Sequence, residues 1–583
     1  MKKPDFLKRL QQGNVLRSAV SYMAVSWLIL QACSLLFPLF GISDSYIRLI
    51  LVGLIILFPI WLLLTYLYDF SLEGITKTDQ SILDEETILK SKSRLNRTII
   101  TVLSLAIIIL VLDRIFIFSG ESGSDLRSIA VIPFSNISGN DAQTYFVDGM
   151  QDELIGTLAM VKDLRVTSKT STNQYKKTTK SVQEIAKELS VDAIIEGSVL
   201  LFQNSLRIQI KLIQAFPIEK TILTQQYDKP LKDVLQIHRE VTKDVVDKVK
   251  VALTDQTQKT LDEKPVVDPY AYELFLRGQS KLSEFTPISI QQSLNYFNKA
   301  KEVDSTFFGG YQGVSSAYMF MMVLGMVKPL EVRDIILENS AKARDLDSKD
   351  IGIQAGVDVW VNYDWENGEK KFKEGLKHNP SNSFGNIYYS HLLACLGRFE
   401  EANYYADKAT EVDPLNPFVF GLKSVVKRAN KEWWATDSIA QISIDMDPGN
   451  PFAYFPKSTA SLKLGNEAQA FKEYMTYLKL TNQDYLGSKM DSIAQIEGFK
   501  KAYNYGGMYF EKIREDHFVP PHLIYYIYNK AGNTEKVLEW LQIAYKEHGH
   551  DMAYLGVAPF SPEIKNDSIY KDLIKKLKLP YVN

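Results

Sequence analysis

Three Asn-Pro or Asp-Pro pairs recur at a fixed interval in the second half of this 583-residue chain. The prolines are Pro380, Pro414 and Pro448, so each pair follows the previous one by 34 residues (414 − 380 and 448 − 414). This interval limits the possible folds strongly, because it is typical of a repeat made of two helices. A single helix pair cannot bury its own apolar face, so such repeats are expected to stack into a solenoid.

Small residues inside the interval agree with this interpretation. In the repeat before Pro414 they are Ser390, Gly397, Ala402 and Ala409. Small side chains let paired helices approach closely, and a proline after the second helix ends that helix. The pattern resembles the tetratricopeptide repeat. We therefore expect six or seven repeats between Tyr270 and His550, within an all-α tetratricopeptide solenoid over 265–583 that has a C-terminal capping helix at 567–577.

The first helix of each repeat lines the concave face of such a solenoid, and this face commonly binds a protein or a peptide. In the repeat with the clearest pattern, five residues are expected to line the binding groove: Phe384, Ile387, His391, Ala394 and Cys395. The alternative is that these side chains only pack between neighbouring repeats. No repeated Lys or Arg pair that would hold a peptide carboxylate is evident. The oligomeric state is not predicted.

Three apolar runs precede the repeats and predict a membrane unit with three transmembrane helices, at 19–40, 47–68 and 98–118. Each run has about 20 residues, enough for a helix to cross roughly 30 Å of hydrocarbon and to contact membrane lipid. Lys and Arg are concentrated in the tail 1–18 and in the loop 69–97, and the positive-inside rule places both in the cytoplasm. Everything after 118 is then expected on the other side of the membrane.

The segment between the apolar runs and the repeats predicts a small α/β domain over 126–254. Strands are expected at 128–134, 164–168, 193–202, 206–213 and 221–228, and helices at 141–160, 181–189 and 231–253. Apolar and polar residues alternate strictly in 206–213, which indicates a strand with one buried face. Ser181 and Glu184 predict a capping box at the start of the second helix.

Two groups of short motifs resemble those of a family of bacterial membrane proteins. The first group surrounds the first two apolar runs: Asn14, Val15, Arg17, Trp27, Leu28, Leu30, Gln31, Phe58, Pro59, Ser71, Glu73, Gly74 and Ile75. The second group resembles a TolB-amino-terminal-like (FlgO-like) domain and comprises 130–134, Asp148-Gly149, 168–171, 196–199 and Tyr227-Asp228. The resemblance implies a multi-pass protein of the bacterial inner membrane, with a cytoplasmic N-terminus, periplasmic domains and no reaction of its own.

Together these features predict a non-catalytic scaffold or assembly factor of the cell envelope that binds other proteins. The alternative is a transmembrane signalling or sensor component related to membrane-bound cyclases or transcription regulators. It would lack a cyclase or DNA-binding domain, because the tail 1–18 and the loop 69–97 are too short to hold one. A formal net charge of −2 argues against a nucleic-acid partner, which would favour a basic surface.

Candidate residues for catalysis or metal binding are few. Three acids lie close together in the first helix expected in the α/β domain: Asp148, Asp152 and Glu153. Acids near a helix start commonly complement the helix dipole. Three possible metal ligands lie near the C-terminal end: His548, His550 and Asp551. Two histidines one residue apart without a third partner are a weak metal pattern. We therefore predict no catalytic residue, no metal and no cofactor.

Overall fold

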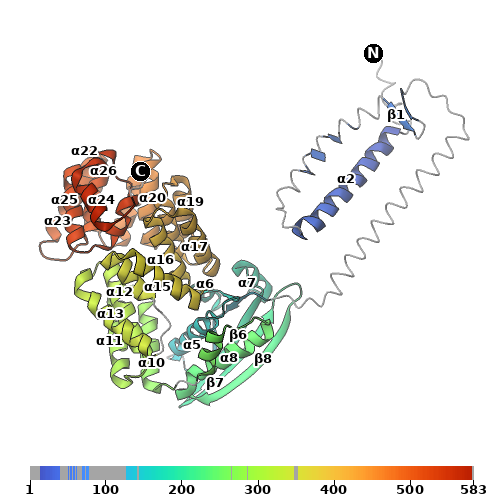
Figure 1. The fold of residues 1–583 in the computed structure, drawn as a ribbon, viewed down its shortest axis with the longest axis horizontal. Coiled ribbons are helices and arrows are strands. Elements are labelled where there is room, and N and C mark those ends of the chain that lie inside the picture. Colours follow the sequence, from blue (N-terminus) through green and yellow to red (C-terminus); the bar gives the residue numbers. More distant parts are fainter. Residues whose placement is uncertain are drawn as a thin grey trace, which may run out of the picture. The chain divides into compact units, whose positions relative to one another are not determined.

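The computed structural model describes residues 14–39, separate positions between 50 and 61, 68–71, 74–77, and 126–580 apart from 141–142, 264–265, 285 and 347–351. The chain divides by its internal contacts into two compact units, Met1–Ser124 and Asp125–Asn583. Figure 1 colours the chain from its N-terminal to its C-terminal end. Each unit is described by itself.

The first unit contains one long helix and a short hairpin. Helix α2 (Asn14–Leu39) has 26 residues. Strands β1 (Tyr68–Ser71) and β2 (Gly74–Lys77) pair antiparallel, with Tyr68 opposite Lys77. The Tyr22 hydroxyl donates a hydrogen bond to the carbonyl oxygen of Leu54 at 2.8 Å. Helix α2 therefore contacts the described part of the segment 50–61.

The prediction of three transmembrane helices is wrong for the part of the chain that the structure describes. Within that part, no helix is both long enough and apolar enough to cross a membrane. The predicted span 98–118 and most of 47–68 lie outside the described residues, and Tyr68, the predicted end of the second span, begins strand β1. The error has a physical reason: apolar composition does not establish one continuous apolar helix, and α2 also carries Arg17 and Gln31.

Two further predictions depended on those helices and are corrected with them. The first is the multi-pass location in a bacterial inner membrane, with a cytoplasmic N-terminus and periplasmic domains. The second is contact with membrane lipid through the three helices. Both required spans that the described residues do not provide.

The second unit begins with a six-stranded sheet in the order β5-β3-β6-β7-β8, in which β4 also pairs with β6. The strands are β3 (Ser128–Val131), β4 (Ser135–Asn136), β5 (Arg165–Val166), β6 (Ala193–Phe202), β7 (Ser205–Gln214) and β8 (Lys220–Pro230). Strand β3 pairs in parallel with β5 and with β6, and β4 pairs in parallel with β6. Strands β6, β7 and β8 form an antiparallel meander. In β7, Leu206, Ile208, Ile210 and Leu212 are buried and the residues between them are exposed. The predicted alternation is thereby confirmed.

Helices cover both faces of this sheet. They are α5 (Thr144–Leu158), α6 (Lys169–Thr172), α7 (Val182–Leu189) and α8 (Val234–Val249), and α9 (Asp255–Asp262) follows them. Helices α5 and α8 pack with Ile129 and Val131 of β3, whereas α7 packs with Ala130 from the opposite face. The capping box predicted from Ser181 and Glu184 is present at the start of α7.

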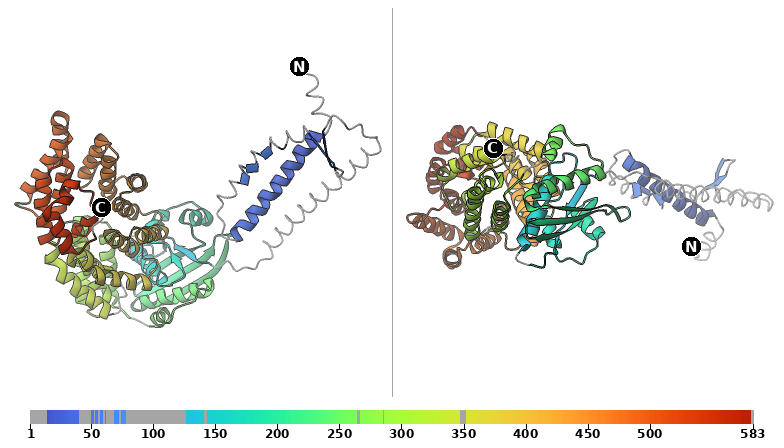
Figure 2. Two further views of the ribbon diagram at one scale, coloured as in Figure 1. Left: turned by 45° about the horizontal axis from the view of Figure 1, so that its top comes forward. Right: turned by 90° about the horizontal axis from the view of Figure 1, so that it is seen from below.

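Helix pairs then follow one another along a curved array (Figures 1 and 2). They are α10 (Pro269–Leu282), α11 (Pro287–Val303), α12 (Phe308–Val323), α13 (Pro329–Asp345), α14 (Gly352–Val357) with the π-helical turn η4 (Asp358–Asn362), α15 (Trp365–His378), α16 (Ser383–Cys395), α17 (Phe399–Val412), α18 (Pro417–Ala429), α19 (Trp433–Met446), α20 (Pro451–Lys463), α21 (Glu467–Leu480), α22 (Asp484–Glu497), α23 (Phe499–Ile513), α24 (Pro521–Ala531) and α25 (Thr534–Lys546). Consecutive helices pack against each other. The predicted solenoid of two-helix repeats is confirmed.

The 34-residue interval corresponds to caps and turns. Asn382, Asn416 and Asn450 each cap the first helix of a repeat by accepting a hydrogen bond from a backbone N–H in its first turn. The turn inside each of these repeats has a residue with positive φ: Gly397 (74°), Lys431 (60°) and Gly465 (88°). Lys431 occupies the position that glycine has in the other two, so this repeat lacks the turn glycine of its neighbours.

The chain ends with η5 (His550–Val557), α26 (Pro562–Asn566) and α27 (Ser568–Leu577). Helix α27 covers nearly the same residues as the capping helix predicted at 567–577, whose role remains a prediction. The indole Nε1 of Trp365 donates to the carbonyl oxygen of Leu577 at 2.7 Å. The end of α27 therefore contacts a repeat that lies more than 200 residues earlier in the sequence.

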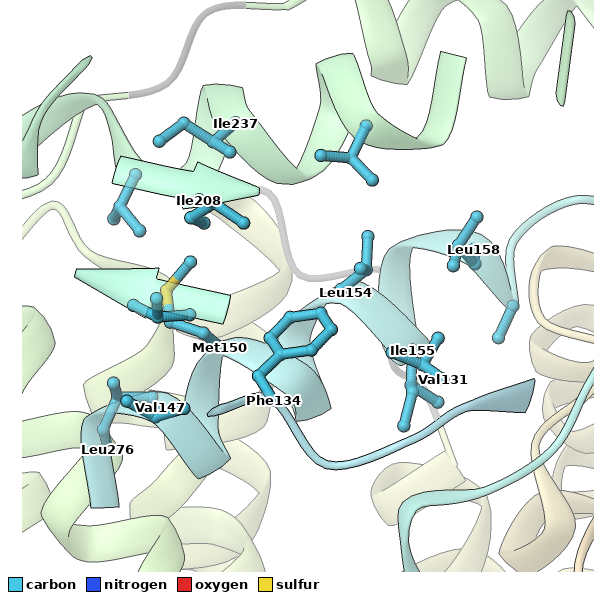
Figure 3. Packing of buried hydrophobic residues seen from close by; sticks show 14 of the residues in the cluster. Val131, Phe134, Val147, Met150, Leu154, Ile155, Leu158, Ile208, Ile237 and Leu276 are labelled. Carbon is cyan, nitrogen blue, oxygen red and sulfur yellow. The ribbon is translucent and has the colours of Figure 1, made fainter. Parts of the chain in front are cut away.

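The α/β domain and the first repeat share one hydrophobic core. Leu276 of α10 lies against Gly149 of α5, where an added Cβ would come within 2.6 Å of a Leu276 methyl carbon. Tyr272 of α10 is fully buried, and its ring centre lies 6.2 Å from that of Phe146. Figure 3 shows Leu276 beside Val147, among the same side chains as Ile208 and Ile237. The predicted limits of the two domains, 126–254 and 265–583, remain predictions.

A second contact joins the edge strand β5 to the turns of the repeats. The N–H of Val166 donates to Ser381 Oγ at 3.1 Å, and the N–H of Ser168 donates to the carbonyl oxygen of Val412 at 3.0 Å. Ser171 Oγ donates to Asp413 Oδ1 at 2.6 Å. The turns that carry the repeated prolines thus cover an edge that would otherwise expose backbone hydrogen-bonding groups.

Candidate binding site on the inner face of the repeats

The five residues predicted to line a groove all lie on α16, and most of them are buried. Ile387, His391, Ala394 and Cys395 are at most 2 % exposed. Ile387 packs with Ala406, Ala409 and Val419 of neighbouring helices, whereas Phe384 is half-buried with its ring centre 5.8 Å from that of Phe418. The packing between repeats therefore accounts for much of their burial.

A segment near the C-terminal end covers the rest of this part of α16. We call residues 549–560 the C-terminal segment. The imidazole Nδ1 of His391 forms a hydrogen bond with the Tyr554 hydroxyl, and its Nε2 lies 3.0 Å from the carbonyl oxygen of Leu422. Tyr554 and Val557 pack in one cluster with Leu392 and Cys395. The covering tyrosine follows His391 by 163 residues, so the sequence pattern of one repeat could not predict it.

Burial shifts the pKa values of His391 and Cys395 on α16. It lowers the pKa of His391 to about 4, although the hydrogen bond to the carbonyl oxygen of Leu422 acts to raise this pKa, so the imidazole is neutral near pH 7. Burial also raises the pKa of the Cys395 thiol well above its ordinary value. A thiol held in its protonated form is a poor nucleophile and a poor metal ligand.

A buried arginine lies at the end of the next first helix, α18. Arg428 is only 5 % exposed, and its Nε and Nη1 have no hydrogen-bond partner among the described residues. The guanidinium carbon lies 5.6 Å from the ring centre of Phe455 and 5.8 Å from that of Tyr526. Aromatic faces stabilise the charge in part. They do not satisfy the two N–H groups, which are expensive to bury unpaired.

Lys530 lies near this arginine, and Lys463 lies near Lys530. Lys530 of α24 is 9 % exposed and donates to Ser458 Oγ at 3.0 Å. Burial, and next the charge of Arg428, lower the pKa of Lys530 to about 7. The pKa of the exposed Lys463 is lowered by the surrounding protein and then by the charge of Lys431. Burial, then the charge of Lys431 and then the charge of Lys463 lower the pKa of Lys565. Like charges that oppose one another's protonation mark a place suited to an anion.

Sequence reasoning missed this basic group because its members come from separate repeats. Arg428, Lys463 and Lys530 end the first helices α18, α20 and α24. A basic residue in the last turn of a helix is ordinary, since it complements the helix dipole. Stacked repeats, however, bring such ends together on one face. The signal available in the sequence was this shared position.

Two histidines and an aspartate meet at the start of α24. His522 Nδ1 lies 3.2 Å from Asp551 Oδ2, and His550 Nε2 lies 3.4 Å from the same oxygen. Burial alone would raise the pKa of Asp551, but the neighbouring His522, His550 and Arg428 hold it below its ordinary value. His548 does not take part, because its Nδ1 lies 2.5 Å from the carbonyl oxygen of Val361 and its ring stacks on Tyr363.

The three acids of α5 do not form a joint site with a nucleophile or a metal in the described chain. Asp148 pairs with Lys176 at 2.7 Å, and Asp152 lies 3.4 Å from Lys169. Burial, and next the charge of Asp152, raise the pKa of Glu153 to about 7. The pairs formed by Asp148 and Asp152 are ordinary surface ion pairs.

One family model matches part of the chain. It is described as the second domain of HilA/YgeH-like transcriptional regulators and matches residues 124–243, which include the sheet and helices α5 to α7. This is less than half of the chain. The resemblance of the same segment to a TolB-like domain is not confirmed by this match and stays a prediction.

Relatives with curated names match over similarly limited lengths. The chain is 29 % identical over 199 residues to "Putative adenylate cyclase 3" of Rhizobium meliloti (strain 1021), covering 34 % of this chain and 32 % of that protein. It is 23 % identical over 144 residues to "Transcriptional regulator HilA" of Salmonella typhimurium, covering 24 % of this chain and 26 % of that protein. The chain thus spans about a third or less of the length of these relatives.

Solved structures similar to parts of this chain include the pilus biogenesis factor PilW (15 % identity, TM-score 0.28, 36 % of this chain and 92 % of that chain). They also include YrrB, titled a tetratricopeptide protein with an unusual peptide-binding site (18 % identity, TM-score 0.22, 34 % of this chain and 96 % of that chain). A third is a human IFIT1 dimer with a capped RNA (13 % identity, TM-score 0.33, 54 % of this chain and 77 % of that chain). The repeat architecture described here therefore rests on the helix pairs of this chain.

Proposed function

We propose that this chain is a non-catalytic protein-interaction protein that binds an acidic peptide segment of a partner protein on the inner face of its repeats. The observation that carries the proposal is Arg428, a buried guanidinium whose Nε and Nη1 lack partners in the described chain. A carboxylate is the acceptor that forms strong, charge-assisted hydrogen bonds with the N–H groups of a guanidinium. The partner is thus expected to supply Asp, Glu or a free C-terminal carboxylate.

The surroundings of Arg428 suit such a ligand. Lys463 is exposed, so a second carboxylate of the same peptide would find a cation there, and the buried Lys530 adds further positive charge. Phe455 and Tyr526 flank the guanidinium and would hold it in place. In this proposal the groove residues of α16 form the neighbouring part of the inner face, where Phe384 remains accessible while the C-terminal segment lies over His391.

A fluorescein-labelled hexaglutamate peptide with a free C-terminus tests the proposal against the full chain by fluorescence anisotropy. Wild type is expected to bind it, and the affinity is expected to fall about tenfold in Arg428→Gln and severalfold in Lys463→Gln. Lys512→Gln, which removes an exposed lysine from the second helix α23, is the matched control and is expected to bind as wild type does. A hexaglutamine peptide should not bind. Equal affinity of Arg428→Gln and wild type would contradict the proposal.

A second candidate function is the regulation of another protein. It is favoured by the match of 124–243 to a domain of HilA/YgeH-like transcriptional regulators and by the matched third of a protein named a putative adenylate cyclase. In that case the α/β domain and the repeats would carry a signal between partners. Cyclic AMP formation from ATP and Mg²⁺ is the discriminating measurement. The proposal predicts none above that of heat-inactivated chain, and turnover would contradict a non-catalytic role.

A further inference from the structure

We propose that His522, His550 and Asp551 form a zinc(II) site that fastens the C-terminal segment to helix α24. One ligand atom from each residue lies within 4.8 Å of the other two. The site goes beyond the proposed peptide binding and does not depend on it. It also replaces the prediction of no metal. That prediction considered His548, His550 and Asp551, which are neighbours in the sequence, and had no further ligand from another part of the chain.

The separations fit a single ion. Ligand atoms at about 2.0–2.1 Å from a tetrahedral zinc ion lie roughly 3.3–3.4 Å from one another. His522 Nδ1 and Asp551 Oδ2 are 3.2 Å apart, and His550 Nε2 and Asp551 Oδ2 are 3.4 Å apart. The third edge joins the two histidine ligand nitrogens, which lie within 4.8 Å of each other. The two edges that share the carboxylate are therefore already at the length that zinc requires.

The ligands lie on elements that the surrounding structure holds. His522 is the second residue of α24, directly after Pro520 and Pro521. His550 and Asp551 begin η5, where the carbonyl oxygen of Gly549 accepts hydrogen bonds from the Tyr363 hydroxyl and from the N–H of Met552, each at 3.0 Å. Such support lowers the entropy that a metal site would otherwise cost.

A small cavity beside the ligands provides an open coordination position. It measures about 10 Å³, and His522, His550, Gly549 and Glu547 are among the residues that line it. This volume is close to that of one ordered water. Three protein ligands with a water in the fourth position are an ordinary arrangement for zinc.

The ligand types select the class of metal. Imidazole nitrogen suits zinc and other late transition metals, whereas Mg²⁺ and Ca²⁺ prefer sites built wholly of oxygen. The cluster offers two imidazoles and one carboxylate. The competing explanation is an ion-paired cluster that needs no metal, and the experiment below separates the two.

The test uses the full chain, freed of metal with a chelator and titrated with ZnSO₄ by calorimetry. Wild type is expected to bind one Zn²⁺ per chain, and CoCl₂ in its place is expected to give the visible absorption of a four-coordinate Co²⁺ site. Asp551→Asn and His550→Gln are each expected to weaken zinc binding at least 100-fold. His517→Gln, which removes an exposed histidine close by, is the matched control and should bind as wild type does.

The control for folding is circular dichroism of each variant, and Asp551→Asn keeps the size of the side chain. Zinc is also expected to raise the melting temperature of wild type and of His517→Gln, but not of Asp551→Asn. The inference is overturned if metal-free wild type takes up no zinc at 100 μM free Zn²⁺. It is equally overturned if Asp551→Asn and His550→Gln bind zinc as tightly as wild type. Hexaglutamate binding does not enter either result, so the two proposals fail separately.

Discussion

Gly465 and Gly156 differ in backbone conformation alone. Both have open space where a Cβ would lie, but only Gly465 has a positive φ, at 88°. Alanine at 465 would be strained in the folded state. Position 156 lies inside helix α5, where alanine fits, and its main effect would be to reduce the conformational freedom of the unfolded chain. We expect Gly465→Ala to lower the free energy of unfolding by about 1 kcal/mol and Gly156→Ala to raise it by about 0.5 kcal/mol. Urea unfolding of the full chain measures both. Shifts in the same direction would contradict this account of the repeat turns.

Glu153 makes stability depend on pH. Burial first, and then the charge of Asp152, raise its pKa to about 7 from an ordinary value of 4.5. The folded state therefore binds the proton more tightly than the unfolded state does. The resulting stabilisation is fully present below pH 4.5 and is lost as the pH rises through 7.

We expect Glu153→Gln to remove this dependence. The variant should gain stability over wild type between pH 5 and pH 8, by at most about 1.4 kcal/mol per pH unit. Urea midpoints at pH 5, 6, 7 and 8 check it. Asp148→Asn, which breaks a surface pair with Lys176, is the control and should show no such gain. Parallel midpoint curves for wild type and Glu153→Gln would exclude the proposed cause.

One turn of the repeats makes a buried polar contact with the α/β domain. Asp413 is fully buried and accepts hydrogen bonds from Ser171 Oγ and from Asn416 Nδ2, each at 2.6 Å. Asp447 has the same position 34 residues later, but it is exposed and accepts from the N–H of Gly449. The same residue type at the same repeat position therefore has a structural role in one turn only.

Asp413→Ala is expected to cost about 2–4 kcal/mol, because it leaves a buried hydroxyl and a buried amide without an acceptor. Asp447→Ala is expected to cost less than about 1 kcal/mol, since water can replace its contact. Chemical unfolding measures both, and limited proteolysis should cut Asp413→Ala first near the turns around β5. Equal costs at the two positions would argue against this docking contact.

At the scale of the whole molecule, the sequence predicted local features well and contacts between distant segments poorly. Local patterns were reliable: the Ser181 and Glu184 capping box, the alternation in β7 and the 34-residue repeats follow from neighbouring residues. The apolar runs misled, since composition does not establish a continuous helix that can cross a membrane. A window along the sequence also cannot detect Tyr554 over His391, because the curvature of the repeats brings them together.

The metal ligands illustrate a signal that was available. His522 begins α24 and His550 follows the end of α25. The two helices of an antiparallel pair place the start of the first beside the end of the second. Histidines at those two positions are therefore expected to lie close together in space, although their positions in the sequence differ by 28 (550 − 522). Arg428, Lys463 and Lys530 follow a similar rule, since all three lie in the last turn of a first helix, in α18, α20 and α24.

The central claim is that the inner face of the repeats binds acidic segments of a partner protein through Arg428. Selection from a phage-displayed library of random peptides against the immobilised full chain tests it most directly, with an Arg428→Gln/Lys463→Gln variant selected in parallel. The account predicts that peptides recovered on wild type are enriched in Asp and Glu, and that this enrichment disappears on the variant. Peptides without acidic enrichment on wild type, or the same acidic peptides recovered on both chains, would contradict it.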